Sequence, residues 1–283
     1  WVLLATLLLD LAARYRVRDV IDVALLAGVY GLGAGTLLYP DTALALLPDT
    51  IMSRVMGGHA LAGFTGLGLF LALTGSRRLR LPLLLGSVVA GIGFGVWVRW
   101  SPSLSDRLSA EIAPETLLVS AVLALAVIVA LYTLATVWRN RALPPSGLVL
   151  SPVSIGLLAI LLLGLLLYRI AREQVGGDAL AFILPLLALC VATLWYRRPE
   201  QGRILLDLHV PPLPLAPWWV LLAILLFAVA AFTAYQQPLY EFGALNQLFL
   251  LEAALALYGA GWLPLVGAAI GLRALYRQRV WLD

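Results

Sequence analysis

The chain has 283 residues, of which 62% are hydrophobic and 12% are charged, and its mean hydropathy is +0.97. A soluble domain carries about 25% charged residues, so this composition argues against a soluble domain and favours a polytopic helical membrane protein. The net charge is +4, but the basic residues are all arginines spread over the ends of apolar segments. We therefore expect no nucleic-acid partner, because such binding requires a basic patch. The single cysteine, Cys190, excludes an internal disulfide and a cysteine-based metal cluster.

The apolar residues fall into nine segments separated by short polar loops. Residues 1–12 cover only about 20 Å, less than the roughly 30 Å core of a bilayer, so we expect a partial span whose natural N-terminus is missing or processed. The other segments are long enough to cross a bilayer, and they are residues 20–39, 50–74, 81–99, 115–138, 148–168, 178–196, 217–235 and 244–272. The sequence therefore predicts an all-α, polytopic transmembrane helical bundle of about nine spans.

The arginines alternate between the two sides that this segment count defines. Fourteen fall on one side, at Arg14, Arg16, Arg18, Arg77, Arg78, Arg80, Arg139, Arg141, Arg197, Arg198, Arg203, Arg273, Arg277 and Arg279. The five on the other side are Arg54, Arg99, Arg107, Arg169 and Arg172. Because cytoplasmic loops of membrane proteins are enriched in basic residues, we expect the arginine-rich side and the C-terminus to be cytoplasmic, in the inner membrane of a bacterium.

Small residues recur at four-residue spacing in several predicted spans. They are Gly31 and Gly35, then Gly58 and Gly66 with Ala62 between them, then Gly91 and Gly95, and finally Gly267 and Gly271. Such rows let helix backbones approach closely in lipid. We therefore expect these glycines to lie at helix contacts, and the second, third and fourth spans to form a compact bundle.

Composition also suggests a division of the chain into three parts. A partial first span with a basic loop (1–19) precedes a Gly-rich four-helix bundle (20–141) and a Leu-rich four-span region (142–283). The apolar segments 115–138, 148–168 and 217–235 consist mainly of Leu, Ala, Val and Ile, and we expect them to face lipid or a partner. In the last segment, Gly259, Gly261 and Pro264 are expected to produce a tilt or a break.

Part of the Gly-rich region carries a family resemblance. Residues 31–41 read GLGAGTLLYPD, Arg54 is followed by Val-Met-Gly-Gly, residues 66–69 read GLGL, and a Gly-rich helix ends at Arg99. From about residue 22 to 138 this arrangement resembles the DoxX-like group of small four-helix bacterial membrane domains. The resemblance implies a four-helix bundle and membership of a redox or quinone-linked complex. The residues after Gly147 carry no such resemblance, and nothing in the chain binds flavin, haem or a thiol substrate by itself.

His59 is the first polar candidate for chemistry, in the third span. It is a candidate haem ligand or hydrogen-bond donor to a quinone carbonyl, and the simpler interpretation is an ordinary hydrogen-bonded histidine near the outer interface. Haem in a bundle usually has two axial ligands, and the only other histidine, His209, is predicted on the opposite side.

Charged residues near the span ends have simple structural interpretations. Arg54 either neutralises an acidic residue or holds a lipid phosphate, or it extends from the span end toward water. Asp10 and Asp22 lie near the inner edge, and we expect structural pairing with the arginines beside them, which are Arg14, Arg16 and Arg18.

Glu252 is the one carboxylate well inside a predicted span, about a turn and a half after Asn246 and Gln247. An ionisable group at that depth is costly and is a functional hypothesis by default. Glu252 could carry a proton, bind a cation or pair with an arginine of a partner chain. Alternatively it is protonated, or hydrogen-bonded to a neighbouring span.

The sequence contains no motif that identifies a catalytic or metal-binding centre. The leading hypothesis is therefore a subunit or scaffold of a larger membrane complex, with lipid and other membrane subunits as partners and no evident cofactor. One alternative is a proton- or ion-coupled transporter that uses Glu252, Asn246 and Gln247. A second is a membrane protein that interacts with lipid or quinone through His59 and Arg54, with haem or quinone as the cofactor to test.

Overall fold

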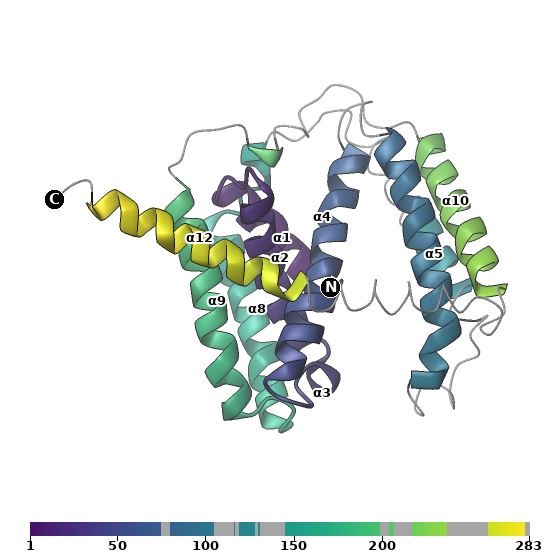
Figure 1. Cartoon of the computed structure of the whole chain (residues 1–283). Helices are drawn as coiled ribbons and strands as arrows, with labels where there is room; N and C mark the ends of the chain where they lie inside the picture. The colour runs from purple at the N-terminus through teal and green to yellow at the C-terminus, as the bar shows by residue number, and fades with distance from the viewer. Residues whose placement is uncertain are drawn as a thin grey trace. The chain divides into compact units, whose positions relative to one another are not determined.

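The computed structural model describes residues 1–74, 80–104, 116, 119–127, 130, 145–198, 204–206, 217–236 and 260–280. Within these ranges every regular element is a helix, which confirms the predicted all-α class for this part of the chain. In chain order the helices are α1 (Val2–Arg14), α2 (Val20–Leu37), α3 (Pro40–Ala43), η1 (Ile51–His59), α4 (Ala60–Thr74), α5 (Arg80–Leu104), η3 (Pro145–Leu148), α8 (Pro152–Ala171), α9 (Gly177–Arg197), α10 (Pro217–Gln236) and α12 (Ala260–Val280) (Figure 1).

Four of these helices are long and apolar enough to cross a membrane, by length and composition: α2, α8, α9 and α10. They coincide with predicted segments two, six, seven and eight. The described residues do not support nine spans. The apolar parts of α5 and α12 are shorter, at Arg80–Gly95 and Pro264–Arg273, and predicted segment 50–74 is divided between η1 and α4. Predicted segment 115–138 lies mostly outside the described residues.

The chain forms two compact units, each made of discontinuous segments. The first comprises Trp1–Gly68, Leu143–Leu208 and Leu251–Asp283, and the second comprises Leu69–Ala142 and His209–Leu250. Each unit combines segments from both halves of the sequence. The predicted three-part division (1–19, 20–141 and 142–283) is based on composition and stays a prediction.

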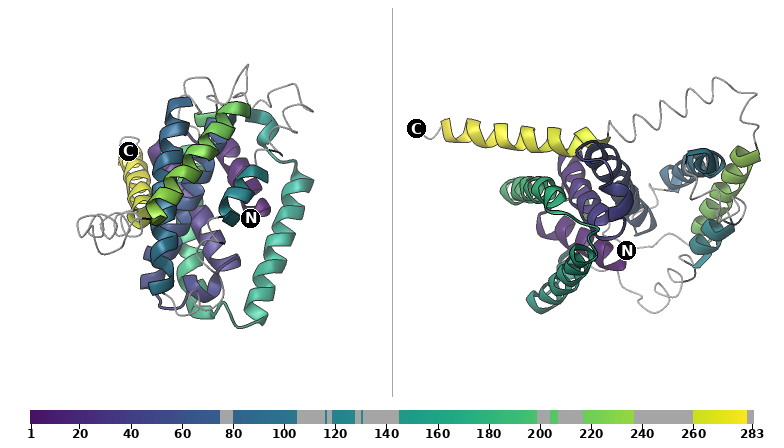
Figure 2. Two further views of the ribbon diagram at one scale, coloured as in Figure 1. Left: turned by 90° about the vertical axis from the view of Figure 1, so that its right-hand side faces the viewer. Right: turned by 90° about the horizontal axis from the view of Figure 1, so that it is seen from below.

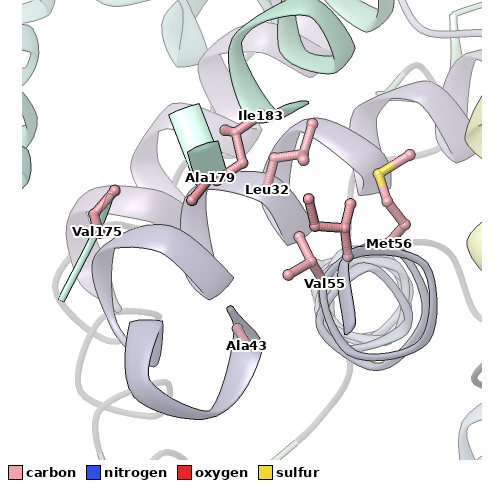
Figure 3. Close-up of a cluster of buried hydrophobic side chains, with 8 residues drawn as sticks. Leu32, Ala43, Val55, Met56, Val175, Ala179 and Ile183 are labelled. Atoms are coloured by element: carbon pink, nitrogen blue, oxygen red, sulfur yellow. The ribbon is translucent and has the colours of Figure 1, made fainter. Parts of the chain in front are cut away.

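Helix α2 lies at the centre of the first unit. Its sequence is apolar on every side, which is typical of a helix buried all round, and 78% of its candidate span is buried. It contacts η1, α9 and α12, and also α1, α3 and α8. Beside it, buried side chains from α2, α3, η1, α9 and the turn before α9 form one cluster (Figure 3), whose members are Leu32, Ala43, Ile51, Val55, Met56, Val175, Ala179 and Ile183.

The first part of predicted segment 50–74 is a π-helix rather than an α-helix. In η1 the backbone N–H of residue i bonds the carbonyl of residue i−5, and the last such bond joins Ala60 to Val55. Gly31 of α2 packs directly on this bond: a Cβ atom added there would contact the Val55 oxygen and lie 2.9 Å from the Ala60 nitrogen. A π-helix is rare and usually short. In this protein α2 approaches η1 closely because residue 31 has no side chain.

Helix α12 runs across the other helices of its unit (Figures 1 and 2). A Cβ atom added to Gly28 of α2 would lie 2.8 Å from Pro264, and one added to Gly267 would lie 3.3 Å from Ile21. The helix continues through Pro264, so α12 does not break at that proline, and the alternative expectation, a tilt of the last segment, stays a prediction. Gly259 and residues 244–258 lie outside the described residues.

The second unit contains the parallel pair α5 and α10, which lie side by side (Figure 2). A Cβ atom added to Gly91 would lie 2.5 Å from the carbonyl oxygen of Phe227, and one added to Gly95 would contact the Ala231 carbonyl oxygen. The tight face of the predicted fourth span therefore packs on a helix from far along the chain. The sequence predicts that the fourth span packs with the second and third spans, and it does not predict this contact of the fourth span with α10.

The contact at Gly31 makes a mutational prediction. Gly31→Ala should lower the stability of the protein by about 1–3 kcal/mol, because a methyl group there meets backbone rather than a movable side chain. Gly66→Ala is the matched control, since a Cβ atom at Gly66 has nothing within 4 Å. Thermal unfolding in detergent measures both, and equal unfolding temperatures for the two variants would contradict this packing.

Candidate functional site

His59 lies at the end of η1 and belongs to a row of aromatic rings. Its ring stacks on Tyr39, with centroids 5.4 Å apart and an angle of 6° between the planes. The ring centroids of Tyr39 and Trp1 are 5.7 Å apart, and those of Trp1 and Tyr30 are 6.3 Å apart. Offset and stacked ring pairs of this kind contribute about 0.5–1.5 kcal/mol each beyond burial. The row places the one described histidine beside the C-terminal end of α2.

The surroundings of this row are mainly apolar. A shallow hollow next to it is lined only by apolar and aromatic side chains, namely Leu4, Leu7, Leu8, Leu11, Val29 and Tyr30. Arg54 lies on the exposed side of η1, whereas Val55 and Met56 are buried. Because a π-helix takes more residues per turn than an α-helix, residues four apart in η1, such as Arg54 and Gly58, do not lie on one face. Gly58 is half-buried and Gly66 is exposed.

The N-terminal end of α2 carries a cluster of four charged side chains. Asp19 caps α2 by accepting a 2.9 Å hydrogen bond from the Asp22 N–H. Arg197, the last residue of α9, donates to Asp19 at 2.7 Å, and its Nε lies 3.0 Å from the Asp22 carboxylate without alignment for a hydrogen bond. Arg18 completes the cluster, with its Nε 3.6 Å from Asp22 and its Nη2 donating to the Arg197 carbonyl at 2.6 Å.

The C-terminal end of α2 is bound by a second arginine, Arg169, from the last turn of α8. Its guanidinium donates to the carbonyl oxygens of Leu37 at 3.0 Å and Leu38 at 3.4 Å. The same group donates to the Gln174 side chain at 2.7 Å, and Gln174 donates in turn to Asp41 at 3.1 Å. The last carbonyls of a helix lack partners within the helix, so Arg169 supplies donors where α2 has none.

The start of α8 is tied to the end of α1 by a buried carboxylate. Asp10, with a fully buried side chain, accepts two hydrogen bonds from Arg14 at 2.9 and 2.8 Å. It also accepts one from the Leu150 N–H at 2.7 Å, and Arg14 donates to the Leu150 carbonyl at 3.2 Å. The predicted pairing of Asp10 and Asp22 with neighbouring arginines is thus confirmed for Arg14 and Arg18.

The predicted packing glycines fall into different environments. In the first unit, a Cβ atom added to Gly35 would lie 2.8 Å from Val55, and one added to Gly271 would contact Thr193 of α9. Gly31, Gly91, Gly95 and Gly267 also lie close to neighbouring helices, as described above. Gly66 has open space around it.

The intramembrane polar candidates of the last segment are not described by the structure. Glu252, Asn246 and Gln247 lie outside the described residues, as does His209. Among the residues that are described, no group of three or more His, Cys, Asp or Glu side chains is arranged to hold a metal ion. Charged residues of the described part come together at the two ends of α2 and where the end of α1 meets the start of α8.

Sequence reasoning did not find the roles of Arg197, Arg169 and Tyr39. Arg197 and Arg169 appear in the sequence only as loop arginines at span ends, and their partners lie more than 130 residues away. Tyr39 is the second residue after the end of α2, and an aromatic residue at a span end is the only signal that the sequence offers.

Comparison of the chain with models of known protein families, with curated proteins and with solved structures found no match. The resemblance of residues 22–138 to DoxX-like domains therefore stays a prediction.

Arg169 provides a test of how α2 is held at its C-terminal end. Arg169→Gln should destabilise the protein by about 1–3 kcal/mol, because carbonyls of α2 lose charged donors. Arg172→Gln is the matched control, since Arg172 is exposed and lies 5.5 Å from the Tyr168 ring centroid. A thermal unfolding series in one detergent compares them. Equal losses in the two variants would refute the role assigned to Arg169.

Asp19 provides a test of the cluster at the other end. Burial alone would raise the pKa of its carboxyl, but the Asp22 N–H and the Arg197 guanidinium hold that pKa below its usual value. Ionised Asp19 therefore stabilises the fold above the pKa of the unfolded chain, and this contribution is lost as pH falls through the folded pKa. The side chain is half-exposed, so the effect is modest.

Asp19→Asn retains a helix cap and removes the charge. The variant should unfold at a lower temperature than the wild type at pH 7, and its unfolding temperature should fall less steeply below about pH 4. Unfolding temperatures measured from pH 7 to pH 3 provide the comparison. Parallel curves for the two proteins would show that the charge of Asp19 contributes nothing to stability.

Proposed function

We propose that the chain is an integral membrane protein that acts as a subunit or scaffold of a larger membrane complex, without a catalytic centre of its own. The proposal includes the nine spans, the bacterial inner membrane and the cytoplasmic C-terminus that the sequence predicts. Its partners are the lipid bilayer and other membrane subunits.

The observation that carries this proposal is the exposure of α8. Only 6% of its apolar span is buried, and its exposed apolar side chains are Val153, Leu157, Ile160, Leu161, Leu163 and Leu167. Both ends of α8 are nevertheless fixed to other helices, by Leu150 and by Arg169. An apolar surface of this length requires lipid or protein to cover it. A helix fixed at both ends and uncovered between them is suited to present its face to a neighbour.

The contacts at the ends of α2 support the predicted orientation of the spans. Arg14, Arg18 and Arg197, which the sequence assigns to the cytoplasmic side, lie with Leu150 at ends of helices that contact one another. Asp41, Arg169 and Gln174, which it assigns to the outer side, lie together at the opposite end of α2. Both groupings agree with an alternating path of α2, α8 and α9 through the membrane.

A substitution on the exposed face of α8 tests the proposal. Ile160→Trp should leave the unfolding temperature unchanged, because the side chain is 68% exposed. It should remove at least one protein that co-purifies in stoichiometric amount with the wild type in mild detergent. Val229→Trp, at a position of α10 that is 56% exposed, is the matched control and should retain that protein. If the wild type purifies without a stoichiometric partner, or the α8 variant keeps every partner, the scaffold proposal fails.

The aromatic row beside His59 favours a second candidate function, an interaction with lipid or a ring-bearing cofactor such as quinone or haem. A planar ring can extend a stack of His59, Tyr39 and Trp1, and the adjoining hollow is apolar. A visible absorbance spectrum of the purified protein tests the haem version. The transporter alternative that uses Glu252 depends on residues outside those described.

A further inference from the structure

The paired ends of α5 and α10 bring a guanidinium and an indole together. Arg80 is the first residue of α5, and Trp219 is the third residue of α10. The Arg80 guanidinium carbon lies 5.0 Å from the centroid of the Trp219 ring. Directly behind this contact, Leu83 and Ala223 are buried against Leu84 and Trp219. The packing of these apolar residues fixes the two polar groups side by side at one end of the pair.

Each of these two side chains has a buried N–H group without an acceptor. The Nε of Arg80 and the Nε1 of Trp219 are buried, and neither has a hydrogen-bond partner in the part of the chain that the structure describes. Both atoms are donors only, so they cannot satisfy each other. A buried donor without an acceptor costs about 1–3 kcal/mol. Two such donors, on side chains whose guanidinium carbon and ring centroid are 5.0 Å apart, point to an acceptor from outside the described residues.

The chemistry of the two donors selects a phosphate group. Arginine binds oxyanions side-on through its Nε and Nη groups, and tryptophan is enriched where membrane spans reach the headgroups. Both residues are half-buried as a whole, so part of each residue is exposed although the two donor atoms are covered. A phosphate supplies several acceptor oxygens and a negative charge that a water molecule lacks.

The surface beside the two donors points to a lipid as the source of that phosphate. Exposed leucines continue from this end along both helices: Leu81 and Leu85 on α5 are 64% and 58% exposed, and Leu221 and Leu225 on α10 are 55% and 59% exposed. Acyl chains require such an apolar surface, whereas free inorganic phosphate does not. Arg80 also follows directly on a sequence, Gly75–Leu79, that contains two further arginines.

We propose that Arg80 and Trp219 bind the phosphate group of a phospholipid at the cytoplasmic end of α5 and α10. This inference requires the membrane location of the proposed function, but not the scaffold role. Guanidinium and indole N–H groups donate to the phosphate oxygens, and the acyl chains lie on the leucine-rich surfaces of the two helices.

The test compares variants that remove one donor at a time. Trp219→Phe retains a ring for the guanidinium and for packing, but it removes the indole N–H. Trp218→Phe is the matched control, because Trp218 is 54% exposed and its ring lies 4.0 Å from that of Trp219. Arg80→Lys retains the positive charge and removes the planar donor fork. Size-exclusion chromatography and unfolding temperatures without lipid establish that each variant is folded.

Native mass spectrometry of the full chain in a phosphate-free maltoside detergent measures the binding of phosphatidylglycerol. Trp219→Phe and Arg80→Lys should each weaken binding by about ten- to hundredfold, the loss expected for one hydrogen bond to a charged group. Trp218→Phe should bind as the wild type does. A glycolipid with the same acyl chains should bind the wild type less tightly, and inorganic phosphate should not displace the phospholipid.

Three outcomes would overturn the proposal. Equal affinities of Trp219→Phe and Trp218→Phe for phosphatidylglycerol would show that the indole N–H of Trp219 does not bind the lipid. Equal binding of the glycolipid and the phospholipid would show that only the acyl chains are bound, and displacement by inorganic phosphate at a comparable concentration would make free phosphate the ligand. None of these results bears on whether a protein partner covers α8, so the two proposals fail separately.

Discussion

Two arginines from the hairpin of α8 and α9 hold the two ends of α2, and the first unit depends on these contacts. Helix α2 is about 27 Å long, and its interior is apolar. Arg197 closes its N-terminal end through Asp19 and Asp22, and Arg169 closes its C-terminal end through the carbonyls of Leu37 and Leu38. The hairpin of α8 and α9 therefore fixes the position of α2 along its axis and which end of α2 lies beside each arginine.

The energetic reason for this arrangement is that polar groups at the ends of an apolar helix need partners. In a medium that offers few hydrogen bonds, an unpaired backbone carbonyl or carboxylate is costly. The charged clusters satisfy these groups with donors and acceptors from other helices, and apolar packing fills the space between. Buried ion pairs contribute little net stability relative to apolar packing, so their effect here is to select one position of α2 along α8 and α9. The middle of α8 remains exposed, which is why a partner or lipid is expected there.

The sequence predicts the features that depend on local patterns. Long apolar runs identify α2, α8, α9 and α10, and spacing of four residues identifies the pairs Asp10–Arg14 and Arg18–Asp22. It does not predict contacts between residues far apart in the chain. Arg197 and Asp19 are 178 residues apart, and no local pattern links them. The π-helical turns of η1 depend on the hydrogen-bond partner that each N–H selects, which apolar periodicity does not encode.

The same limit applies to the candidate sites. Glycine spacing predicts that Gly91 and Gly95 face a helix, but the identity of that helix, α10, requires the fold. His59 is recognisable as a polar residue in an apolar segment, whereas its stack with Tyr39 depends on where α2 ends. In the sequence, Arg80 is one of the arginines predicted on the cytoplasmic side, and nothing links it to Trp219. The fold is needed to show that each has a buried N–H without an acceptor in the part of the chain that the structure describes.

Labelling of single cysteines in sealed vesicles tests the central claim most directly. In a Cys190→Ala background, Arg16→Cys and Arg198→Cys lie near the Arg197 end of α2, and Asp41→Cys and Glu173→Cys lie near the Arg169 end. An impermeant thiol reagent should modify the first two from one side of the membrane and the last two from the other. Modification of all four from the same side, or of the two members of either pair from different sides, would contradict the arrangement of α2 between the two arginines.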